Sequence, residues 1–319
     1  MMRRMLPILF SALVACAAPE APLEEAPNPP AALPLPEGAV EVPAGDIRHH
    51  ELITSNLLGS LRPNEQDIPE IKKRGRLVVG VDQSQNLLSF RDPATGELSG
   101  FEISLAKEIA RDIFGDPEKV EFRFVDSASW IQALEEQDVD CVIRSVSITR
   151  DRQDQVFFST PYLTGDTQLL SERNSGIEQA EDIGEGTVCA AEGATGVQRI
   201  AKAAPDSTLL IVRSSADCLL ALQQNQADAI VSDNTILSGM VAQDPLTQIV
   251  GDPLARESYG VAFAKPGARH KTEGLIRQVN VTLERIFRDG TWEKMFEEWF
   301  GAYLPPQDPP ALNYRKEQP

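Results

Sequence analysis

The stretch Ser127–Tyr162, SASWIQALEEQDVDCVIRSVSITRDRQDQVFFSTPY, predicts a short helix, an Asp-Val-Asp turn and a buried strand, in that order. Small hydroxylated residues follow this strand, and Arg152 comes three positions after Thr149. In open α/β sheets, small ligands bind at the carboxyl ends of strands. Ser145, Ser147 and Arg152 are therefore a candidate carboxylate site, with Arg152 as the bidentate partner. The alternative is an ordinary strand-to-helix turn that carries surface arginines.

Strands and helices alternate on both sides of this stretch. Strands are predicted at 76–82, 120–125 and 139–145, and helices at 100–114 and 128–136. After Gly165 the pattern restarts, with strands at 187–191, 209–213 and 229–232 and helices at 195–204, 215–224 and 234–241. A strand at 258–264, a helix at 272–287 and a segment at 290–300 close the pattern. Such alternation favours a mainly parallel sheet.

Two βαβ series predict an α/β fold with two lobes. Lobe 1 would comprise 76–164 plus 258–301, and lobe 2 would comprise 165–257. If 290–300 packs on lobe 1, the chain crosses between the lobes near 164–170 and 251–258. Two crossing segments form a hinge, which can close the lobes around a central ligand cleft.

Residues 1–16 are typical of an export signal. Arg3 and Arg4 precede an apolar run, 5–15, that is much shorter than the roughly 20 residues of a membrane span. The run ends in LVAC at 13–16, which resembles the bacterial lipobox whose cysteine, here Cys16, becomes lipidated. A lipidated terminus would anchor the protein without spanning the bilayer. The alternative is a plain signal peptide with an incidental cysteine.

The segments next to the lobes are rich in proline. Residues 17–45 carry eight prolines, several glutamates and no lysine or arginine, which predicts an unfolded acidic tether. Residues 46–75 would form an N-terminal extension that precedes the first lobe. The tail, 302–319, is again rich in proline, and we expect it to be loosely ordered.

Charge and metal-binding residue types limit the partners. The formal net charge of −18 disfavours nucleic acid, which repels an acidic protein. The three histidines have no partners at ligand spacing, so no metal site is predicted. Cys141 lies within a predicted strand and is interpreted as a buried apolar residue. In an exported protein the two remaining cysteines, Cys189 and Cys218, predict a disulfide, with two free thiols as the alternative.

An ordered set of motifs over 76–301 resembles the family 3 extracellular solute-binding proteins, the polar amino-acid receptors of ABC importers. The set comprises GFEI at 100–103, the DVD turn at 138–140, SITRDR at 147–152, FSTPY at 158–162, GATG at 193–196, ADA at 227–229 and the close GTW…WF at 290–300. With the lipobox, the tether and ADCLLALQQ at 216–224, the chain looks closest to actinobacterial glutamate/glutamine-binding lipoproteins. The resemblance implies the two-lobed fold of periplasmic binding proteins and an extracytoplasmic, lipid-anchored monomer without a cofactor. Such a protein would bind glutamate or glutamine and deliver it to membrane permease subunits.

The resemblance also implies roles for particular residues at the α-amino and α-carboxyl groups of the ligand. Arg152 would pair with the α-carboxylate, helped by Ser147 and by the backbone at Ser145. The N–H groups of Ala194 and Thr195, at the start of a helix, would face the same anion. Asp233 would accept the α-ammonium, with a helix N-cap as its alternative role.

The ligand side chain would meet a different group of residues. The resemblance places Asp82 and Ser127 at this end of the cleft. Glutamate- and aspartate-binding members often carry an arginine where Trp130 stands. Arg144 can supply a cation from another direction; otherwise the cleft suits a neutral side chain such as glutamine.

Two further functions fit the same fold. A sensor would close in the same way but report to a membrane signalling protein. Cyclohexadienyl dehydratases share the fold, and catalysis would require a general acid such as Glu192, which is otherwise a solvent-facing acid. The sequence contains no nucleophile–histidine pairing, phosphate loop or cofactor fingerprint, so no catalytic residue is predicted.

Overall fold

The computed structural model describes residues 33–48, 50–64, 67–267 and 269–316. The predicted signal peptide with Cys16 and most of the predicted tether, 17–32, therefore lie outside the described residues. The chain divides into two units, Met1–Pro34 and Leu35–Pro319, and the described helices and strands belong to the second. No helix within the described ranges is both long and apolar enough to cross a membrane.

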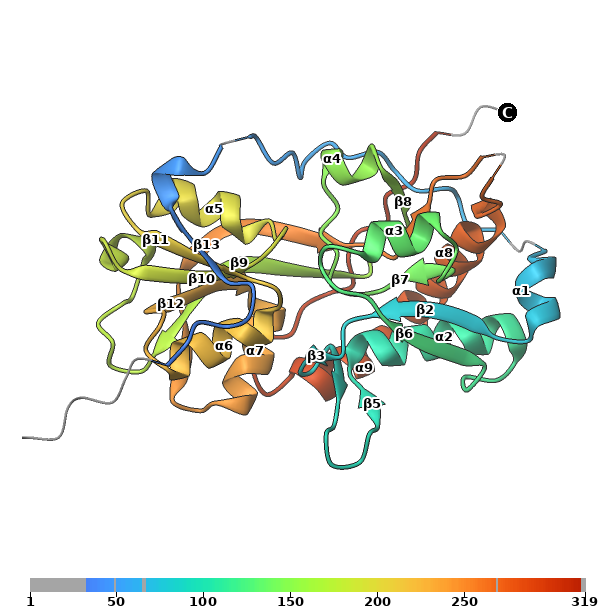
Figure 1. Cartoon of the computed structure of the whole chain (residues 1–319). Coiled ribbons are helices and arrows are strands. Elements are labelled where there is room, and N and C mark those ends of the chain that lie inside the picture. The colour runs from blue at the N-terminus through green and yellow to red at the C-terminus, as the bar shows by residue number, and fades with distance from the viewer. Residues whose placement is uncertain (1–32, 49, 65–66, 268, 317–319) are drawn as a thin grey trace, which may run out of the picture. The chain divides into compact units, whose positions relative to one another are not determined.

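The first lobe is built on a five-stranded sheet (Figure 1). Its strands, in spatial order, are β6 (Val120–Phe124), β2 (Leu77–Val81), β7 (Cys141–Val142), β14 (Ala262–Ala264) and β8 (Val156–Phe158). β2 is parallel to β6 and β7, whereas β14 is antiparallel to β7 and β8. A small sheet of β3 (Ser84–Gln85), β4 (Ser89–Arg91) and β5 (Leu98–Ser99) adjoins it along the chain.

Helices cover both faces of the five-stranded sheet because its strands are apolar on both sides. Leu77, Val79 and Val81 share a core with α2 (Phe101–Phe114), α8 (Glu273–Arg288) and α9 (Thr291–Phe300). Val78 and Val142 belong to a second core with α3 (Trp130–Glu135). The remaining helices of this lobe are α1 (Pro69–Arg74) and α4 (Arg150–Gln153). Alternate residues of one strand thus serve two cores, as in buried parallel strands.

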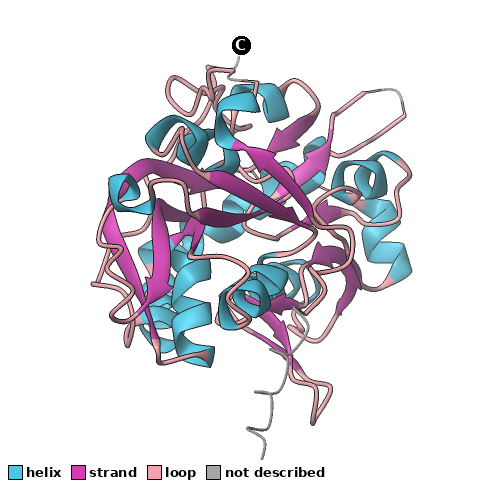
Figure 2. Cartoon of the chain, turned by 60° about the vertical axis from the view of Figure 1, so that its left-hand side comes forward, coloured by secondary structure: helices cyan, strands magenta, loops and turns pink. Residues whose placement is uncertain are grey.

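The second lobe has a six-stranded sheet (Figure 2). Its order is β1 (Val40–Pro43), β11 (Thr208–Val212), β10 (Thr187–Ala191), β12 (Ala229–Asp233), β9 (Leu163–Glu172) and β13 (Thr247–Tyr259). β10 is parallel to β11 and β12, and the other pairings are antiparallel. Its helices are α5 (Gly196–Ala203), α6 (Ser215–Gln223), α7 (Asn234–Gln243) and the 3-10 turns η1 (Ala44–Asp46) and η2 (Ala180–Ile183).

The chain passes between the lobes twice, and the two crossings lie side by side. It leaves β8 for β9 and returns from β13 to β14. The Tyr162 N–H donates to the carbonyl of Tyr259 at 2.9 Å, which joins the two crossings. The Trp292 indole of α9 donates to the carbonyl of Tyr162 at 2.7 Å, so the C-terminal helix packs beside this hinge. The two-lobed α/β fold is confirmed.

The sequence analysis missed the long antiparallel strands β9 and β13. Gly251 and Pro253 interrupt β13 and read as loop residues, and its pairing with β9 shifts register between Val250 and Ala255. The sheet of the second lobe is consequently mixed. The expectation of a mainly parallel sheet is wrong for this lobe, and the sheet of the first lobe is also mixed, with two parallel and two antiparallel pairings.

The proline-rich ends are more ordered than predicted. The last residues of the expected tether, Val40–Pro43, pair with β11 as an edge strand, a position that tolerates proline. In the expected loose tail, Leu304 is buried, the Asn313 N–H donates to Thr160 Oγ1 at 2.9 Å, and Tyr314 forms a β-bridge with Ser60. Residues 317–319 lie outside the described ranges. The average composition of the proline-rich ends does not indicate that short segments within them pack against the lobes.

The predictions for Cys141, Cys189 and Cys218 are confirmed. Cys189 of β10 and Cys218 of α6 form a disulfide that closes a separation of 29 residues. Cys141 is a buried free thiol. The disulfide fixes α6 to the centre of the second sheet.

Candidate functional site

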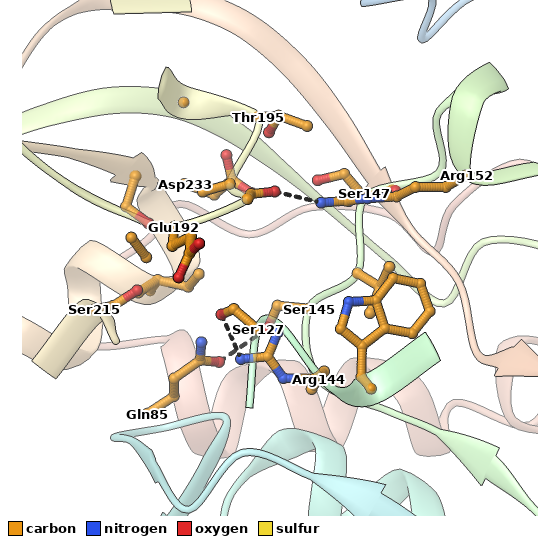
Figure 3. Close-up of a pocket in the computed structure, with 18 residues that line it drawn as sticks. Gln85, Ser127, Arg144, Ser145, Ser147, Arg152, Glu192, Thr195, Ser215 and Asp233 are labelled. Carbon is orange, nitrogen blue, oxygen red and sulfur yellow. Dashed lines mark hydrogen bonds between the residues drawn. The ribbon is translucent and has the colours of Figure 1, made fainter. Parts of the chain in front are cut away.

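A cavity lies between the lobes, and all the predicted ligand residues except Asp82 line it (Figure 3). The first lobe contributes Gln85, Ser127, Trp130, Arg144, Ser145, Val146, Ser147 and Arg152. The second lobe contributes residues 191–196, Ser215, Ser232, Asp233 and Ile236. Most of these residues lie at or just beyond the ends of strands, where the sequence analysis located the site.

Arg152 reaches across the cleft from α4. Thr149 caps this helix by accepting from the Arg152 N–H, which places the arginine in its first turn. The guanidinium donates to the carbonyl of Ser147 at 2.8 Å and, from Nη2, to the carbonyl of Gly193 in the second lobe at 3.0 Å. Burial lowers the pKa of Arg152, and the carboxylates of Glu257 and Asp233 oppose that shift. The side chain is therefore a partly buried cation that an anion in the cavity would stabilise.

The loop opposite Arg152 precedes α5. Gly193 adopts a left-handed φ of 69°, which favours glycine at this turn. The Ala194 N–H already donates to the carbonyl of Ala191 at 3.2 Å, so it can reach an anion only as a shared donor. Within the described part of the chain, no backbone carbonyl accepts from the Thr195 N–H. Thr195 is thus the better placed of the two predicted donors.

Asp233 ends β12 and faces the same cavity as Arg152 (Figure 3). It stands at the N-cap position of α7, yet its side chain makes no capping hydrogen bond, contrary to the alternative role. Its carboxylate instead accepts from Thr167 Oγ1 at 2.8 Å and Tyr259 Oη at 2.7 Å. Burial raises the pKa of Asp233, whereas these hydrogen bonds and Arg152 oppose the shift.

Ser145 differs from its predicted role. Its backbone N–H donates to Glu102 Oε1 at 2.6 Å and is not free to bind a ligand carboxylate. Tyr162 Oη donates to the same oxygen at 2.6 Å. Burial raises the pKa of Glu102, and these hydrogen bonds oppose the shift. Ser145 has a left-handed φ of 55°, and Glu102 supports this unusual turn from α2.

Asp82 lies behind the cavity and not in its wall. Its Oδ2 forms an ion pair with Arg144 Nη2 at 2.9 Å, and its Oδ1 accepts from the backbone and hydroxyl of Ser84. The same Arg144 nitrogen donates to Ser127 Oγ at 3.1 Å. Arg144 is the cation that could stand in for an arginine at position 130, and its charge is therefore partly balanced by Asp82. Arg144 Nε is buried and has no hydrogen-bond partner among the described residues.

The sequence analysis missed several residues of the cavity wall and its surroundings. Gln85 is the last residue of β3, and its Oε1 accepts from Ser145 Oγ at 3.2 Å, while Ser215 opens α6. Glu192, considered only as a possible acid, also lines the cavity. These residues lie near the end of a strand or at the start of a helix, and that position in the sequence could have identified them as candidates for the cavity wall.

A buried acid stands close to the charged end of the site. Glu257 of β13 is fully buried, and its Oε1 lies 3.4 Å from Arg199 Nη2 of α5. Burial raises the pKa of Glu257 to about 7, and the charge of Asp233 adds to the increase. Glu257 Oε2 has no hydrogen-bond partner among the described residues. Within those residues, no group of three or more His, Cys, Asp or Glu side chains is arranged to hold a metal ion.

The chain is similar to known amino-acid-binding proteins. Residues 77–302 match the model of the bacterial extracellular solute-binding proteins, family 3. The glutamine-binding protein GlnH of Bacillus subtilis is 32% identical over 246 residues, 77% of this chain and 88% of that protein. The glutamate-binding protein GluB of Corynebacterium efficiens is 29% identical over 72% of this chain and 80% of that protein. The structure of an ancestral arginine-binding protein bound to glutamine superposes with a TM-score of 0.64 and 33% identity, covering 72% of this chain and 99% of that one.

Proposed function

This chain belongs to the family 3 bacterial extracellular solute-binding proteins, and we propose that it binds a polar amino acid, glutamate or glutamine, for delivery to an ABC importer. One observation carries the proposal. Arg152, a partly buried cation, and Asp233, a buried anion, come from opposite lobes and line one cavity. An α-amino acid presents the complementary pair of charges, and either group left unpaired there would be costly to bury.

The ligand's α-carboxylate would bind the Arg152 guanidinium together with Ser147 and the Thr195 N–H. Its α-ammonium would bind Asp233, whose carboxylate is already oriented by Thr167 and Tyr259. Because the two groups belong to different lobes, a bound zwitterion would hold the lobes together. Ligand binding would then favour closure through contacts that only the closed form can make.

The side chain of the ligand would extend toward Arg144, Gln85 and Ser127. Arg144 retains a buried Nε–H without a partner, which calls for an oxygen acceptor. Glutamate and glutamine both carry an oxygen at the end of the side chain, where it could accept from Arg144. Trp130 packs beside this end and supplies an apolar wall.

Binding should be measured with the folded chain against the twenty amino acids by thermal shift, followed by calorimetry. A ligand at 100 times its dissociation constant stabilises the folded state by about 2.7 kcal/mol, which raises the melting temperature by a measurable amount. We expect glutamate or glutamine to give the largest increase. An unchanged melting temperature with every amino acid would contradict the proposal.

We also propose a lipid anchor at Cys16, outside the described residues, that would keep the receptor beside the permease. Mass spectrometry of the membrane fraction tests it. A mature chain that starts at Cys16 with added acyl mass supports the anchor. A chain that starts elsewhere without acyl mass would contradict it, and would leave the binding proposal intact.

The cavity would bind without chemical change. Glu192 lines it, as a dehydratase-type acid would need to, but the three relatives compared above are named as binding proteins. Recovery of unchanged glutamate or glutamine after prolonged incubation is the expected result. Appearance of a product would favour the enzymatic alternative.

A further inference from the structure

We propose that residues 50–61, hereafter the strap, tie the two lobes together at the edge of the cleft formed by α4 and α5, and limit how far the lobes open. In Figure 1 the blue segment runs from the region of α5 past α4 toward α1. The inference rests on the hinged opening that the proposed function requires. It adds a restraint that the two crossing strands alone do not provide.

The strap is firmly attached to α4 of the first lobe. The carbonyl of Ile53 accepts from the Arg150 N–H at 3.0 Å. The Leu58 N–H donates to Gln153 Oε1 at 3.0 Å, and Gln153 Nε2 donates back to the Leu58 carbonyl at 2.7 Å. A paired side-chain amide of this kind imitates a strand partner and fixes the backbone at Leu58. These bonds reach the helix that carries Arg152.

The end of the strap is embedded in the first lobe. Ser60 Oγ donates to the carbonyl of Phe158 at 2.8 Å, and Asn280 Nδ2 donates to the carbonyl of Leu61 at 2.7 Å. The Leu61 side chain is fully buried in the core of this lobe. Release of this end would expose an apolar side chain and two buried polar groups, so it is a permanent anchor.

The strap also contacts α5 of the second lobe. The His50 N–H donates to Gln198 Oε1, and Arg199 Nη2 donates to Thr54 Oγ1, both at 3.4 Å. These are long bonds at exposed or partly exposed positions, which makes them the weakest attachments. The His50 ring also lies 3.5 Å from Asp151 of α4, so the strap touches both helices within a few residues.

Chain length turns these attachments into a limit on opening. Before the strap, β1 pairs with β11 and Ala44 is buried in the core of the second lobe, with Ile47 packed against it. Only the chain from Ile47 to Ile53 separates this anchor from the first-lobe anchor, and six residues span at most about 20 Å when fully extended. On opening, the contacts to α5 would break first and the chain would then become taut.

The strap acts on the elements that hold the ligand. α4 carries Arg152, and α5 begins directly after the loop that contains Thr195. Keeping these elements close would favour the closed form before any ligand binds. It would also slow the exchange of ligand with solvent.

Lengthening the strap tests the inference. Six residues, Gly-Ser-Gly-Ser-Gly-Ser, are inserted between Glu51 and Leu52 in the full chain, which leaves both anchors intact. The control has the same insertion between Thr95 and Gly96, in an exposed turn of the first lobe. Spin labels on Glu135→Cys and Asp206→Cys, at exposed positions in different lobes, report the distance between them in the ligand-free protein with Cys16→Ser.

We expect the strap insertion to shift the label distances to longer values and to broaden them, while the control keeps the parental distribution. The double substitution Thr54→Ala, Gln198→Ala removes both bonds between the strap and α5 and should give a smaller shift in the same direction. It decides the question if circular dichroism shows that the insertion variant is unfolded. The inference would be overturned if the folded insertion variant gave the same label distances as the parent. If the insertion variant does not fold, the same result in the double variant would overturn it. This comparison is made without ligand, so it tests the strap alone. The proposed function is tested separately, by whether L-glutamate or L-glutamine changes the label distances in the parent.

Discussion

Arg152 Nη2 lies 3.0 Å from the carbonyl oxygen of Gly193, so a side chain of the first lobe is hydrogen-bonded to the ligand-facing loop of the second. This bond exists only when the lobes are close together. A bound carboxylate would give the same guanidinium an anionic partner on the cavity side, and a guanidinium bonds more strongly to a carboxylate than to a neutral carbonyl. Arg152 would then join the closure of the lobes to the binding of the ligand.

Replacement of Arg152 by alanine should abolish most of the affinity. Truncating one partner of a buried, hydrogen-bonded charge pair costs about 2–5 kcal/mol, or at least about 30-fold in dissociation constant. Calorimetry with glutamate and glutamine measures the loss. Arg150→Ala is the matched control because Arg150 lies on the same helix and pairs with Asp154 at the surface. Equal affinity of the folded Arg152→Ala protein and the parent would remove the arginine from the site.

Much of the fold followed from local patterns. The predicted strand 187–191 coincides with β10, since a short apolar run between turn residues leaves little freedom in its ends. The disulfide could be predicted because Cys16 ends the expected signal peptide and Cys141 lies in a buried strand, which leaves one pair of cysteines in an exported protein. The resemblance to the family placed Arg152 and Asp233 at one ligand site, and each follows a predicted strand, one in each lobe.

The support behind the site could not be predicted in the same way. Glu102 bonds to Ser145 from 43 residues away, on a helix face whose pattern indicates only burial. Glu257 lies on β13, a strand concealed by Gly251 and Pro253. The strap has no regular secondary structure, and its contacts with α4 and α5 depend on how the lobes pack. Each of these depends on long-range contacts that periodicity does not encode.

The disulfide should contribute substantially to the stability of the second lobe. Closing a loop of 29 residues corresponds to about 3–4 kcal/mol in the chain-entropy model. The double variant Cys189→Ala, Cys218→Ala should therefore unfold at clearly lower denaturant concentration than the parent. Cys141→Ala serves as a control for loss of a buried sulfur without loss of a crosslink. A midpoint no lower than that of the control would show that the bond adds nothing.

Glu257 should make stability fall as the pH rises toward neutrality. Its folded-state pKa of about 7 lies above the ordinary value of 4.5, so the folded protein binds its proton more tightly than the unfolded chain. Its favourable contribution is then complete below about pH 4.5 and is lost as the pH rises through 7. Glu257→Gln should flatten this part of the free energy of unfolding, measured by denaturant titration from pH 4.5 to 8.

An exposed glutamate provides the comparison for that experiment. Glu185→Gln removes a carboxylate of the same lobe at a solvent-exposed position. Its profile should be parallel to that of the parent over the whole range. If the Glu257→Gln profile is also parallel to the parent's, the buried carboxylate does not titrate in this interval.

Asp82 should tune the choice between glutamate and glutamine through Arg144. The two side chains form an ion pair of 2.9 Å with little exposure, 11% for Arg144 and 6% for Asp82. Because the Asp82 carboxylate balances its charge, Arg144 offers hydrogen bonds but little net charge to the ligand side chain. Asp82→Asn removes the compensating anion, so the affinity for glutamate should rise relative to glutamine by about tenfold, equivalent to about 1.4 kcal/mol.

A double-mutant cycle identifies the group responsible for that change. In Arg144→Met, and in Asp82→Asn combined with Arg144→Met, the cation is absent and the substitution at 82 should no longer alter the ratio of the two dissociation constants. Calorimetry on the four proteins gives the ratios directly. A shift toward glutamate that persists without Arg144 would mean that Asp82 acts on the ligand itself, in spite of its position behind the cavity wall. An unchanged ratio in Asp82→Asn alone would show that the ion pair does not set specificity.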